Sequence, residues 1–214
     1  MCADCHSTNL QKNYDSKSDT YKTTFSEIDV SCEACHGPSS SHVAYYKNPT
    51  EEYHPPQLYM DTNLSSQELV DKCARCHSRR SQISKHFDYK GDYMDHYSPS
   101  LIADPLYEMD GQILDEDYVY GSFVQSKMYH NGVSCRDCHD VHSLKLKQQG
   151  NNLCLTCHEP AYNEPAHHFH SAGSEGAQCI KCHMPGKTYM GNDYRRDHSF
   201  RIPRPDQTEL YGVS

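Results

Sequence analysis

Every cysteine of this chain lies in one repeated pattern, Cys-x-x-Cys-His. The twelve cysteines form six such motifs, at residues 2–6, 32–36, 73–77, 135–139, 154–158 and 179–183. A histidine follows the second cysteine in all six motifs. With 16 histidines in 214 residues, this would happen by chance with a probability of about two in ten million. The pattern therefore reflects a chemical requirement that the fold has to meet.

This spacing is typical of covalent haem attachment. Two thiols add to the vinyl groups of a porphyrin, and the adjacent histidine ligates iron from the same side. Zinc sites also use Cys-x-x-Cys pairs, but neither they nor a disulfide framework needs the adjacent histidine. The sequence thus predicts six haem c groups, attached at Cys2, Cys5, Cys32, Cys35, Cys73, Cys76, Cys135, Cys138, Cys154, Cys157, Cys179 and Cys182. The corresponding iron ligands are His6, His36, His77, His139, His158 and His183.

Composition supports a core built around cofactors. Only 36% of residues are hydrophobic and the mean hydropathy is −0.89, values that indicate poor packing in a chain without cofactors. Porphyrin faces would supply the missing apolar surface. The spacing between motifs has no fixed period, which argues against a solenoid.

Charge and hydropathy restrict partners and location. The formal net charge of −9 disfavours nucleic acid and is compatible with a positively charged redox protein. No run of 18 apolar residues occurs, so we expect no transmembrane segment. Haem attachment takes place outside the cytoplasmic membrane, yet no signal peptide precedes Cys2. We therefore expect an exported protein, periplasmic or extracellular, whose numbering begins inside a longer precursor.

A few regular elements can be predicted. Ser65 and Glu68 form a capping-box pattern, which predicts a helix from about residue 66 through the third motif. Apolar residues at helical spacing predict a second helix over 116–130, ending at Asn131-Gly132. A small hairpin is expected between Tyr14 and Phe25. Eleven prolines and eleven glycines indicate irregular connections elsewhere.

The ten histidines outside the motifs are enough to ligate six irons from the second side. The expected distal ligands are His42, His96, His130, His142, His198 and one or two members of the cluster His167, His168 and His170. His54 and His86 are expected to be exposed. The arginine pairs at 79–80 and 195–196 could bind haem propionates or be solvated surface charges.

Four segments carry a resemblance to a known family. They are Cys2-Ala-Asp-Cys-His-Ser-Thr-Asn-Leu, Ser26-Glu-Ile-Asp-Val-Ser-Cys-Glu-Ala-Cys-His-Gly-Pro, Tyr120-Gly-Ser-Phe-Val-Gln-Ser-Lys-Met-Tyr, and the stretch from Cys182-His-Met-Pro to Arg195-Arg-Asp-His-Ser-Phe-Arg-Ile-Pro-Arg-Pro. The chain resembles multihaem c-type cytochromes that are often fused to tetratricopeptide repeats. More distantly it resembles the tetrahaem cytochromes of hydroxylamine oxidation and the pentahaem nitrite reductases.

The resemblance implies a fold and an organisation. The fold would be mostly α with extensive irregular loops, organised around haems stacked in parallel and perpendicular pairs. Residues 1–214 would form a single hexahaem domain. Relatives continue beyond both ends, so an adjoining repeat domain or another subunit could supply some distal ligands.

The resulting functional hypothesis is electron transfer through largely bis-histidine haems, in exchange with redox partner proteins. Two alternatives stay open. A reductase of nitrite, hydroxylamine or a sulfur oxyanion would need one haem with an open distal position beside acid–base groups, but the Cys-x-x-Cys-Lys variant of the nitrite reductases is absent. Self-assembly into a conducting cytochrome filament is the other.

Overall fold

The computed structural model describes residues 2–49, 58–60 and 62–213. These residues form two compact units. Unit 1 comprises Met1–Cys76 and Arg80–Pro99, and unit 2 comprises His77–Arg79 and Ser100–Ser214. The division falls within the third motif, whose cysteines belong to unit 1 and whose histidine belongs to unit 2.

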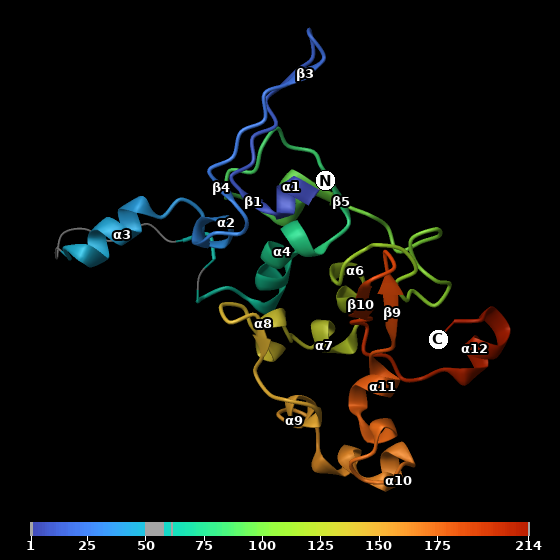
Figure 1. The fold of residues 1–214 in the computed structure, drawn as a ribbon. Helices are drawn as coiled ribbons and strands as arrows, with labels where there is room; N and C mark the ends of the chain where they lie inside the picture. Colours follow the sequence, from blue (N-terminus) through green and yellow to red (C-terminus); the bar gives the residue numbers. More distant parts are fainter. Residues whose placement is uncertain (1, 50–57, 61, 214) are drawn as a thin grey trace. The chain divides into compact units, whose positions relative to one another are not determined.

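Unit 1 contains short helices and three two-stranded antiparallel sheets (Figure 1). Its helices are α1 (Cys2–Cys5), α2 (Cys32–His36), α3 (Ser40–Lys47), α4 (Ser66–His77, whose last residue is assigned to unit 2) and α5 (Tyr93–His96). Its strands are β1 (Ser7–Thr8), β2 (Tyr14–Asp15), β3 (Thr20–Tyr21), β4 (Glu27–Ile28), β5 (Arg80–Gln82) and β6 (Tyr97–Pro99). The pairs are β1 with β4, β2 with β3, and β5 with β6.

The small core of unit 1 forms around α4. Leu69, Val70 and Ala74 of this helix are buried, and Val70 and Ala74, four positions apart, lie on one face. Arg75 is also buried, and its guanidinium donates to the backbone oxygen of Ala34 at 2.8 Å. This hydrogen bond ties the third attachment helix to the second.

Aromatic rings extend this core toward β6. Tyr97 is 2% exposed and stacks on Tyr93 with ring centres 5.5 Å apart. The Arg80 guanidinium lies 4.0 Å from the centre of the Tyr97 ring and pairs with Asp4 at 2.6 Å. A cation over a buried ring and an ion pair together hold α1 against the β5–β6 sheet.

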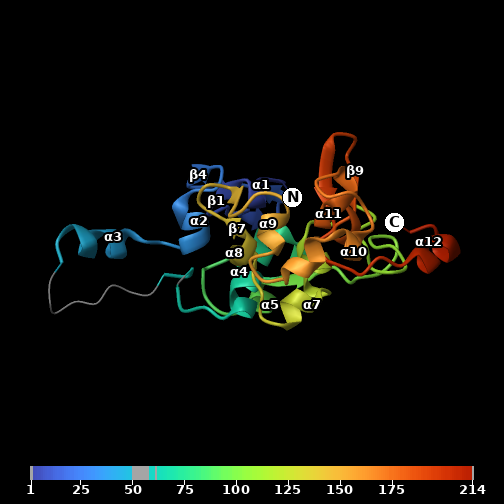
Figure 2. The same ribbon diagram turned by 90° about the horizontal axis from the view of Figure 1, so that it is seen from below.

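Unit 2 is likewise made of short pieces. Its helices are α6 (Tyr120–Val124), α7 (Lys127–His130), α8 (Cys135–Cys138), α9 (Asn151–Cys154), α10 (Pro165–His168), α11 (Cys179–His183) and α12 (Pro205–Tyr211), with the 3-10 helices η1 (Pro160–Asn163) and η2 (Glu175–Ala177). Its strands are β7 (His139–Asp140), β8 (Lys145–Leu146), β9 (Gly186–Tyr189) and β10 (Asp193–Arg196). The β9–β10 hairpin follows α11 directly (Figures 1 and 2).

The core of unit 2 lies where the 104–124 segment meets this hairpin. Tyr107, Ile113 and Phe123 are buried. The Tyr189 hydroxyl of β9 donates to the backbone oxygen of Ile113 at 3.0 Å. The hairpin is thereby fixed to the segment that leads into α6.

The structure confirms two of the predicted elements. The capping box is present: the Glu68 backbone N–H donates to Ser65 Oγ at 3.2 Å, and the Ser65 N–H donates to the Glu68 carboxylate at 2.8 Å. Helix α4 then runs through the third motif, as predicted. The hairpin between Tyr14 and Phe25 is present as β2 and β3.

The prediction of one helix over 116–130 is wrong. The structure has α6 and α7 with a break at Ser126, which adopts an extended conformation (ψ 145°) and accepts a hydrogen bond from the Tyr129 N–H at 3.0 Å. A serine that caps a new helix competes with continuation of the old one. The stop at Asn131-Gly132 is correct, since Gly132 has a φ of +82°.

The expected mostly α fold also needs correction. The described residues contain twelve α-helices and five two-stranded sheets, and many of the helices are four or five residues long. A helix of that length is unstable in isolation, so the short segments need other contacts to hold them. The architecture is mixed, with small sheets between attachment helices.

Candidate haem attachment sites

The attachment motifs coincide with the short helices. In five motifs both cysteines lie in a helix, namely α1, α2, α4, α8 and α11. In the fifth motif Cys154 ends α9 and Cys157 follows in a turn, with its N–H donating to the Cys154 oxygen at 3.2 Å. Residues three apart on one turn share a face, and none of the twelve cysteines forms a disulfide. Each pair can therefore present two thiols to one porphyrin.

Several histidines have a ring nitrogen bonded to a backbone oxygen, as iron ligands usually do. A ligating histidine usually donates its other ring N–H to a backbone oxygen, which fixes the ring. His36 Nδ1 donates to the Met60 oxygen at 3.2 Å, and His183 Nδ1 donates to the Arg201 oxygen at 2.7 Å. In both motif histidines Nδ1 is the bonded nitrogen, as in a ligand that binds iron through Nε2, so the donor set fits haem.

His198 forms a pair with the proximal histidine of the fourth motif. The ring centres of His139 and His198 are 6.5 Å apart, and their planes differ by 23°. Two imidazoles that bind one metal from opposite sides, each through a nitrogen about 2 Å from it, have ring centres roughly 6 Å apart. His198 Nδ1 donates to the Arg196 oxygen at 2.9 Å, so its Nε2 is also available.

The sixth motif has a similar pair. The ring centres of His167 and His183 are 6.3 Å apart with an interplanar angle of 9°. Both histidines belong to unit 2, on α10 and α11. In the same cluster, His168 Nδ1 accepts from the His170 N–H at 3.2 Å, while His168 Nε2 is buried without a hydrogen-bond partner. Because Nδ1 accepts, a neutral His168 ring carries its proton on Nε2, which is therefore a buried N–H donor in this arrangement and not a nitrogen prepared for iron.

Burial lowers the pKa of two of the expected iron ligands. Desolvation, and next the neighbouring His139, lower the pKa of His77. Desolvation is also the main cause that lowers the pKa of His198, although its hydrogen bond to Arg196 acts in the opposite direction. Neutral imidazole is the form that binds a metal.

The other expected distal ligands have different surroundings. His96 has both ring nitrogens engaged, with Nε2 2.7 Å from the Lys90 oxygen and Nδ1 3.1 Å from Ser84 Oγ. His42 lies on α3 with its ring 4.7 Å from that of Tyr46. His130 ends α7 and is exposed, and His142 lies in the exposed turn between β7 and β8. These four remain predictions as iron ligands. His86 is exposed, and His54 lies outside the described residues.

In unit 1 the attachment motifs approach one another. Cys5 Sγ lies 3.8 Å from the backbone oxygen of Cys76. A hydrogen bond between the two thiols is the main cause that raises the pKa of Cys5 and lowers that of Cys76 to about 7. Cys35 also lies close enough to affect the pKa of Cys76. The first and second motifs therefore both lie beside the cysteines of the third.

In unit 2 the last three motifs form a similar series. The Cys179 N–H donates to Asn151 Oδ1 at 3.0 Å, which joins α11 to α9. Burial and the neighbouring Cys179 raise the pKa of Cys154 to about 11. Burial, followed by charges that include Cys157, raises the pKa of Cys138. The fifth motif thus lies next to both the fourth and the sixth.

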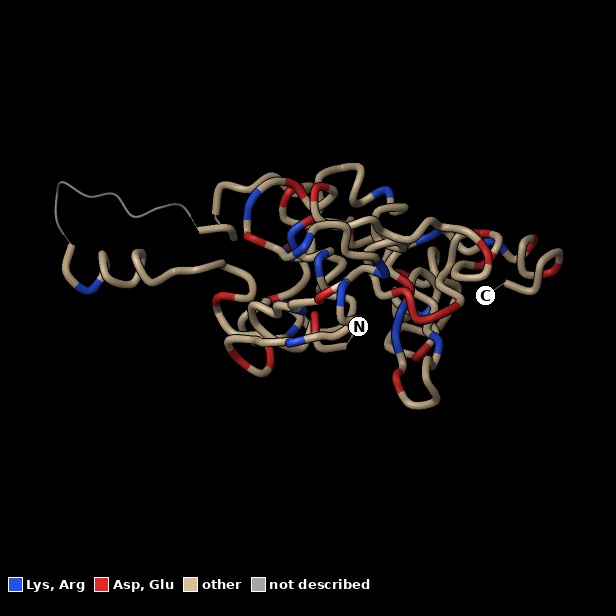
Figure 3. Tube along the Cα trace, turned by 90° about the horizontal axis from the view of Figure 1, so that it is seen from above, with Lys and Arg blue, Asp and Glu red and all other residues tan. Residues whose placement is uncertain are grey.

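The arginine pairs are bonded to protein groups. Arg79 pairs with Asp115 at 3.0 Å, and Arg80 pairs with Asp4. Arg195 pairs with Asp193 and Glu116, and Arg196 donates to the backbone oxygens of Ile180 and Met184. Through these contacts the four arginines connect segments that lie beside the attachment motifs. Lysines and arginines are otherwise scattered along the chain (Figure 3).

Apolar side chains beside the motifs are left open to solvent. Val30 precedes the second motif and is 51% exposed, while Val141 and Leu144 follow the fourth and are 47% and 89% exposed. Within the described residues few large side chains are buried. Porphyrin faces are the apolar surface that such side chains could cover.

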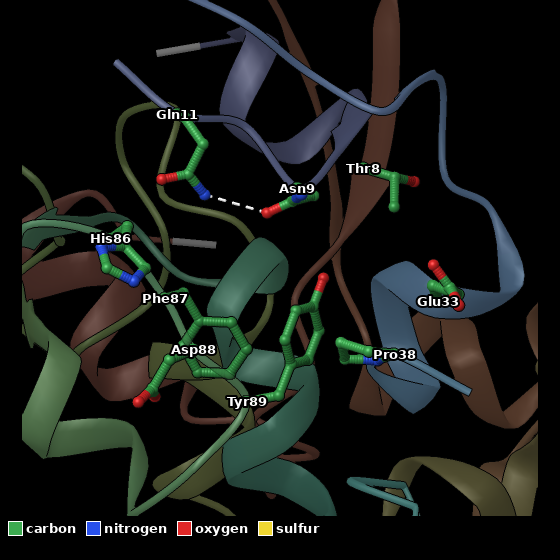
Figure 4. A pocket seen from close by; sticks show the side chains of 9 residues that line it. All are labelled: Thr8, Asn9, Gln11, Glu33, Pro38, His86, Phe87, Asp88 and Tyr89. Carbon is green, nitrogen blue, oxygen red and sulfur yellow. Dashed lines mark hydrogen bonds between the residues drawn. The ribbon is translucent and has the colours of Figure 1, made fainter. Parts of the chain in front are cut away.

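A cavity of about 330 Å³ with a mixed polar and apolar lining lies in unit 1 (Figure 4). It is lined by an imidazole, a phenol and two carboxylates, from His86, Tyr89, Glu33 and Asp88 among others. Gly37 packs closely against the Tyr89 ring, since a Cβ there would lie 3.2 Å from it. None of the described lining residues is a motif cysteine or an expected iron ligand. The cavity therefore has acid–base groups, and its lining residue Phe87 contacts the expected ligand His96 with ring centres 5.0 Å apart.

Two residues that the sequence did not reveal position His198. The buried Ser122 hydroxyl of α6 accepts from the His198 N–H at 3.1 Å. The Asp197 carboxylate accepts from the Ile113 N–H at 3.2 Å and from the Ser199 N–H at 2.8 Å. Only the Asp-His-Ser-Phe-Arg run gave a hint, because it carries both a ligand and the carbonyl that binds His183.

Two family models match parts of the chain. The model described as "Cytochrome c554 and c-prime" matches residues 1–37, which contain the first two motifs, and "Doubled CXXCH motif" matches residues 128–162, which contain the fourth and fifth. No curated protein matches the sequence significantly. The finer resemblance to cytochromes fused to tetratricopeptide repeats stays a prediction.

One solved structure is similar in fold. It is titled "Crystal Structure of Outer Cell Wall Cytochrome OcwA", with a TM-score of 0.64 and 16% sequence identity. The match covers 99% of this chain and 58% of that one, so this chain spans somewhat more than half the length of that protein. No helix in the described part of this chain has the length and apolar character needed to cross a membrane.

Proposed function

We propose that this chain is a multihaem c-type cytochrome that transfers electrons through six haem c groups, largely with histidine on both sides of the iron; the two family models and the similar solved structure support this class of protein. When bound, haem supplies a one-electron redox centre. The protein holds each group by two thioethers and sets its potential through ligands, burial and hydrogen bonds.

The observation that carries this proposal is the pairing of imidazoles in unit 2. His198 lies opposite His139, and His167 opposite His183, at the separation of two ligands to one metal. Histidine on both sides favours low-spin iron and low potentials. Such a site has no position for a substrate, which supports a carrier over a reductase.

The contacts between motifs support an order for the haems within each unit. In unit 1 the third motif's cysteines lie beside those of the first and second. In unit 2 the fourth, fifth and sixth motifs follow one another in space as in sequence. Closely spaced cofactors allow electrons to pass from one to the next.

The environment of the protein follows from the same chemistry. Attachment of haem to Cys-x-x-Cys-His takes place outside the cytoplasmic membrane, so we propose an exported protein, periplasmic or extracellular. The similar solved structure is titled an outer cell wall cytochrome, which supports this location. The net charge of −9 favours a partner with a positively charged docking surface.

A redox titration of the holoprotein, followed by visible and electron paramagnetic resonance spectra, tests the function. We expect reversible reduction of all haems and only low-spin signals in a form that includes any flanking polypeptide. A high-spin haem with steady turnover of nitrite or hydroxylamine would contradict electron transfer as the main role.

A further inference from the structure

A buried acidic cluster in unit 2 has no part in haem attachment. Its centre is Asp117, whose side chain is 0% exposed and whose two carboxylate oxygens have no hydrogen-bond partner. One carboxylate oxygen of the adjacent Glu116 is also buried without a partner. Burying a charged carboxylate without a hydrogen-bond partner costs free energy. Burial therefore disfavours the charged form of these two side chains.

The charges around Asp117 do not balance. Arg79 Nη1 lies 3.5 Å from Asp117 Oδ1, but it is closer to Asp115, at 3.0 Å. Arg195 pairs with Glu116 and with Asp193. Two arginines therefore face four carboxylates, and the one without a hydrogen bond is also the most deeply buried.

The opposite side of the cluster provides little compensation. Tyr107 and Tyr189 face the carboxylates, and burial followed by the charges of Asp117 and Asp197 raises the pKa of both phenols to about 12. Asp197 itself is saturated by the hydrogen bonds described above. Desolvation raises the pKa of Asp117 to about 6, with Arg79 opposing and the neighbouring acids adding to the rise.

A small cavity adjoins this position. A cavity of about 10 Å³ is lined by Asp115, Asp117, Tyr118, Tyr189 and Arg195 among others, and a single water needs about 10–15 Å³. The side chain of Asp115 is 55% exposed. One water molecule in the cavity would connect the buried carboxylate to solvent.

The same cluster adjoins an iron ligand. Arg79 is two residues after His77, and its N–H donates to the Asp117 backbone oxygen at 3.2 Å. Arg195, the partner of Glu116, is close enough to His77 to lower its pKa. A negative charge that arrives at the iron held by His77 is therefore felt at Asp117 through a low-dielectric interior.

We propose that Asp117 is a proton-binding site whose occupancy follows the oxidation state of the iron ligated by His77. One electron from an external one-electron donor reduces that iron, and the Asp117 carboxylate takes up one proton from solvent. The added negative charge is thereby neutralised, and oxidation releases the proton again. This inference rests on the proposed haem binding at His77.

The test is the reduction equilibrium of the hexahaem protein as a function of pH between 5 and 8. In the wild type, one haem should become up to tenfold harder to reduce for each pH unit, which is about 59 mV for one electron. Asp117→Asn should abolish that dependence while keeping all haems attached. The matched control is Asp115→Asn, an exposed acid on the same arginine, which should retain it.

A second measurement does not depend on the variant folding. Infrared difference spectra of the wild type should show a protonated carboxyl band that appears on reduction. Absence of both this band and the pH dependence, or an unchanged dependence in Asp117→Asn, would overturn the proposal. If the Asp117 proposal fails but all haems are still reduced reversibly, the proposed electron-transfer function is unaffected. If the haems are not reduced reversibly, the proposed function itself is refuted.

Discussion

A histidine binds iron through one ring nitrogen, so the partner of its other nitrogen decides how well the ring is prepared for that role. His198 and His183 each have Nδ1 bonded to a backbone oxygen of the same segment, those of Arg196 and Arg201. His96 by contrast has neighbours at both nitrogens. These hydrogen bonds fix the orientation of the His198 and His183 rings without any contact with haem.

Replacing His198 by Ala should therefore convert one haem to a high-spin state that binds carbon monoxide, without loss of attached haem. The physical reason is removal of one axial ligand from the iron opposite His139. Electron paramagnetic resonance and intact mass measure the two quantities. His86→Ala is the control and should leave the spectrum unchanged. A wholly low-spin spectrum in the His198 variant would refute its assignment.

The sequence predicted the attachment residues but could not select among the distal histidines. The motifs are local, so spacing alone identifies them. The pairing of His198 with His139 depends on a tertiary contact between α6 and the 197–201 segment. Ser122 supplies that contact, and a single buried serine has no distinctive sequence signal.

Among the helices, a prediction from sequence was correct where the capping residues and the helical segment indicated the same start. Helix α4 begins at its capping box and carries the third motif. The prediction for 116–130 failed because apolar spacing continued across Ser126, while that residue's side chain formed a cap of its own. Helix propensity and apolar periodicity do not show whether Ser126 continues the first helix or caps the second. That choice depends on the hydrogen bond and burial of its hydroxyl.

The cap of α4 gives a prediction with a defined pH dependence. Hydrogen bonds from Ser65 lower the pKa of Glu68, so its contribution to stability is complete above the unfolded pKa of about 4.3. The contribution is lost as the pH falls through the lower folded value. Amide exchange at Leu69 should therefore accelerate below about pH 4, and Glu68→Gln should remove this dependence.

Ser65→Ala should weaken the first turn of α4 by about 1 kcal/mol at neutral pH. The same amide exchange measurement reports the loss. Ser66→Ala, one residue inside the helix, is the matched control and should have a much smaller effect. Equal effects of the two substitutions would show that the cap does not stabilise this helix.

At the scale of the whole molecule, cofactors have to replace an ordinary hydrophobic core. Four-residue helices and two-residue strands do not hold themselves together. Intact mass should show an excess equal to six haem groups. Chain produced without haem attachment should lack stable tertiary structure, measured by near-ultraviolet circular dichroism and rapid proteolysis. A compact, protease-resistant apoprotein would contradict a haem-built core.

Carbon monoxide binding and substrate turnover distinguish an electron carrier from a reductase. We expect histidine on both sides of two irons in unit 2, and the chain has ten histidines outside its motifs. The reduced protein, with any flanking polypeptide, should therefore bind carbon monoxide poorly and turn over nitrite or hydroxylamine negligibly with an artificial donor. His198→Ala provides the positive control, because its opened site should bind carbon monoxide at once. A different result would assign catalysis to unit 1. The wild type would bind carbon monoxide rapidly and turn over substrate, and substitution of Tyr89 or His86 in the cavity of unit 1 would abolish that turnover. Carbon monoxide binding by the isolated 214-residue chain alone would not assign catalysis, since a distal histidine from flanking polypeptide or another subunit would be missing there.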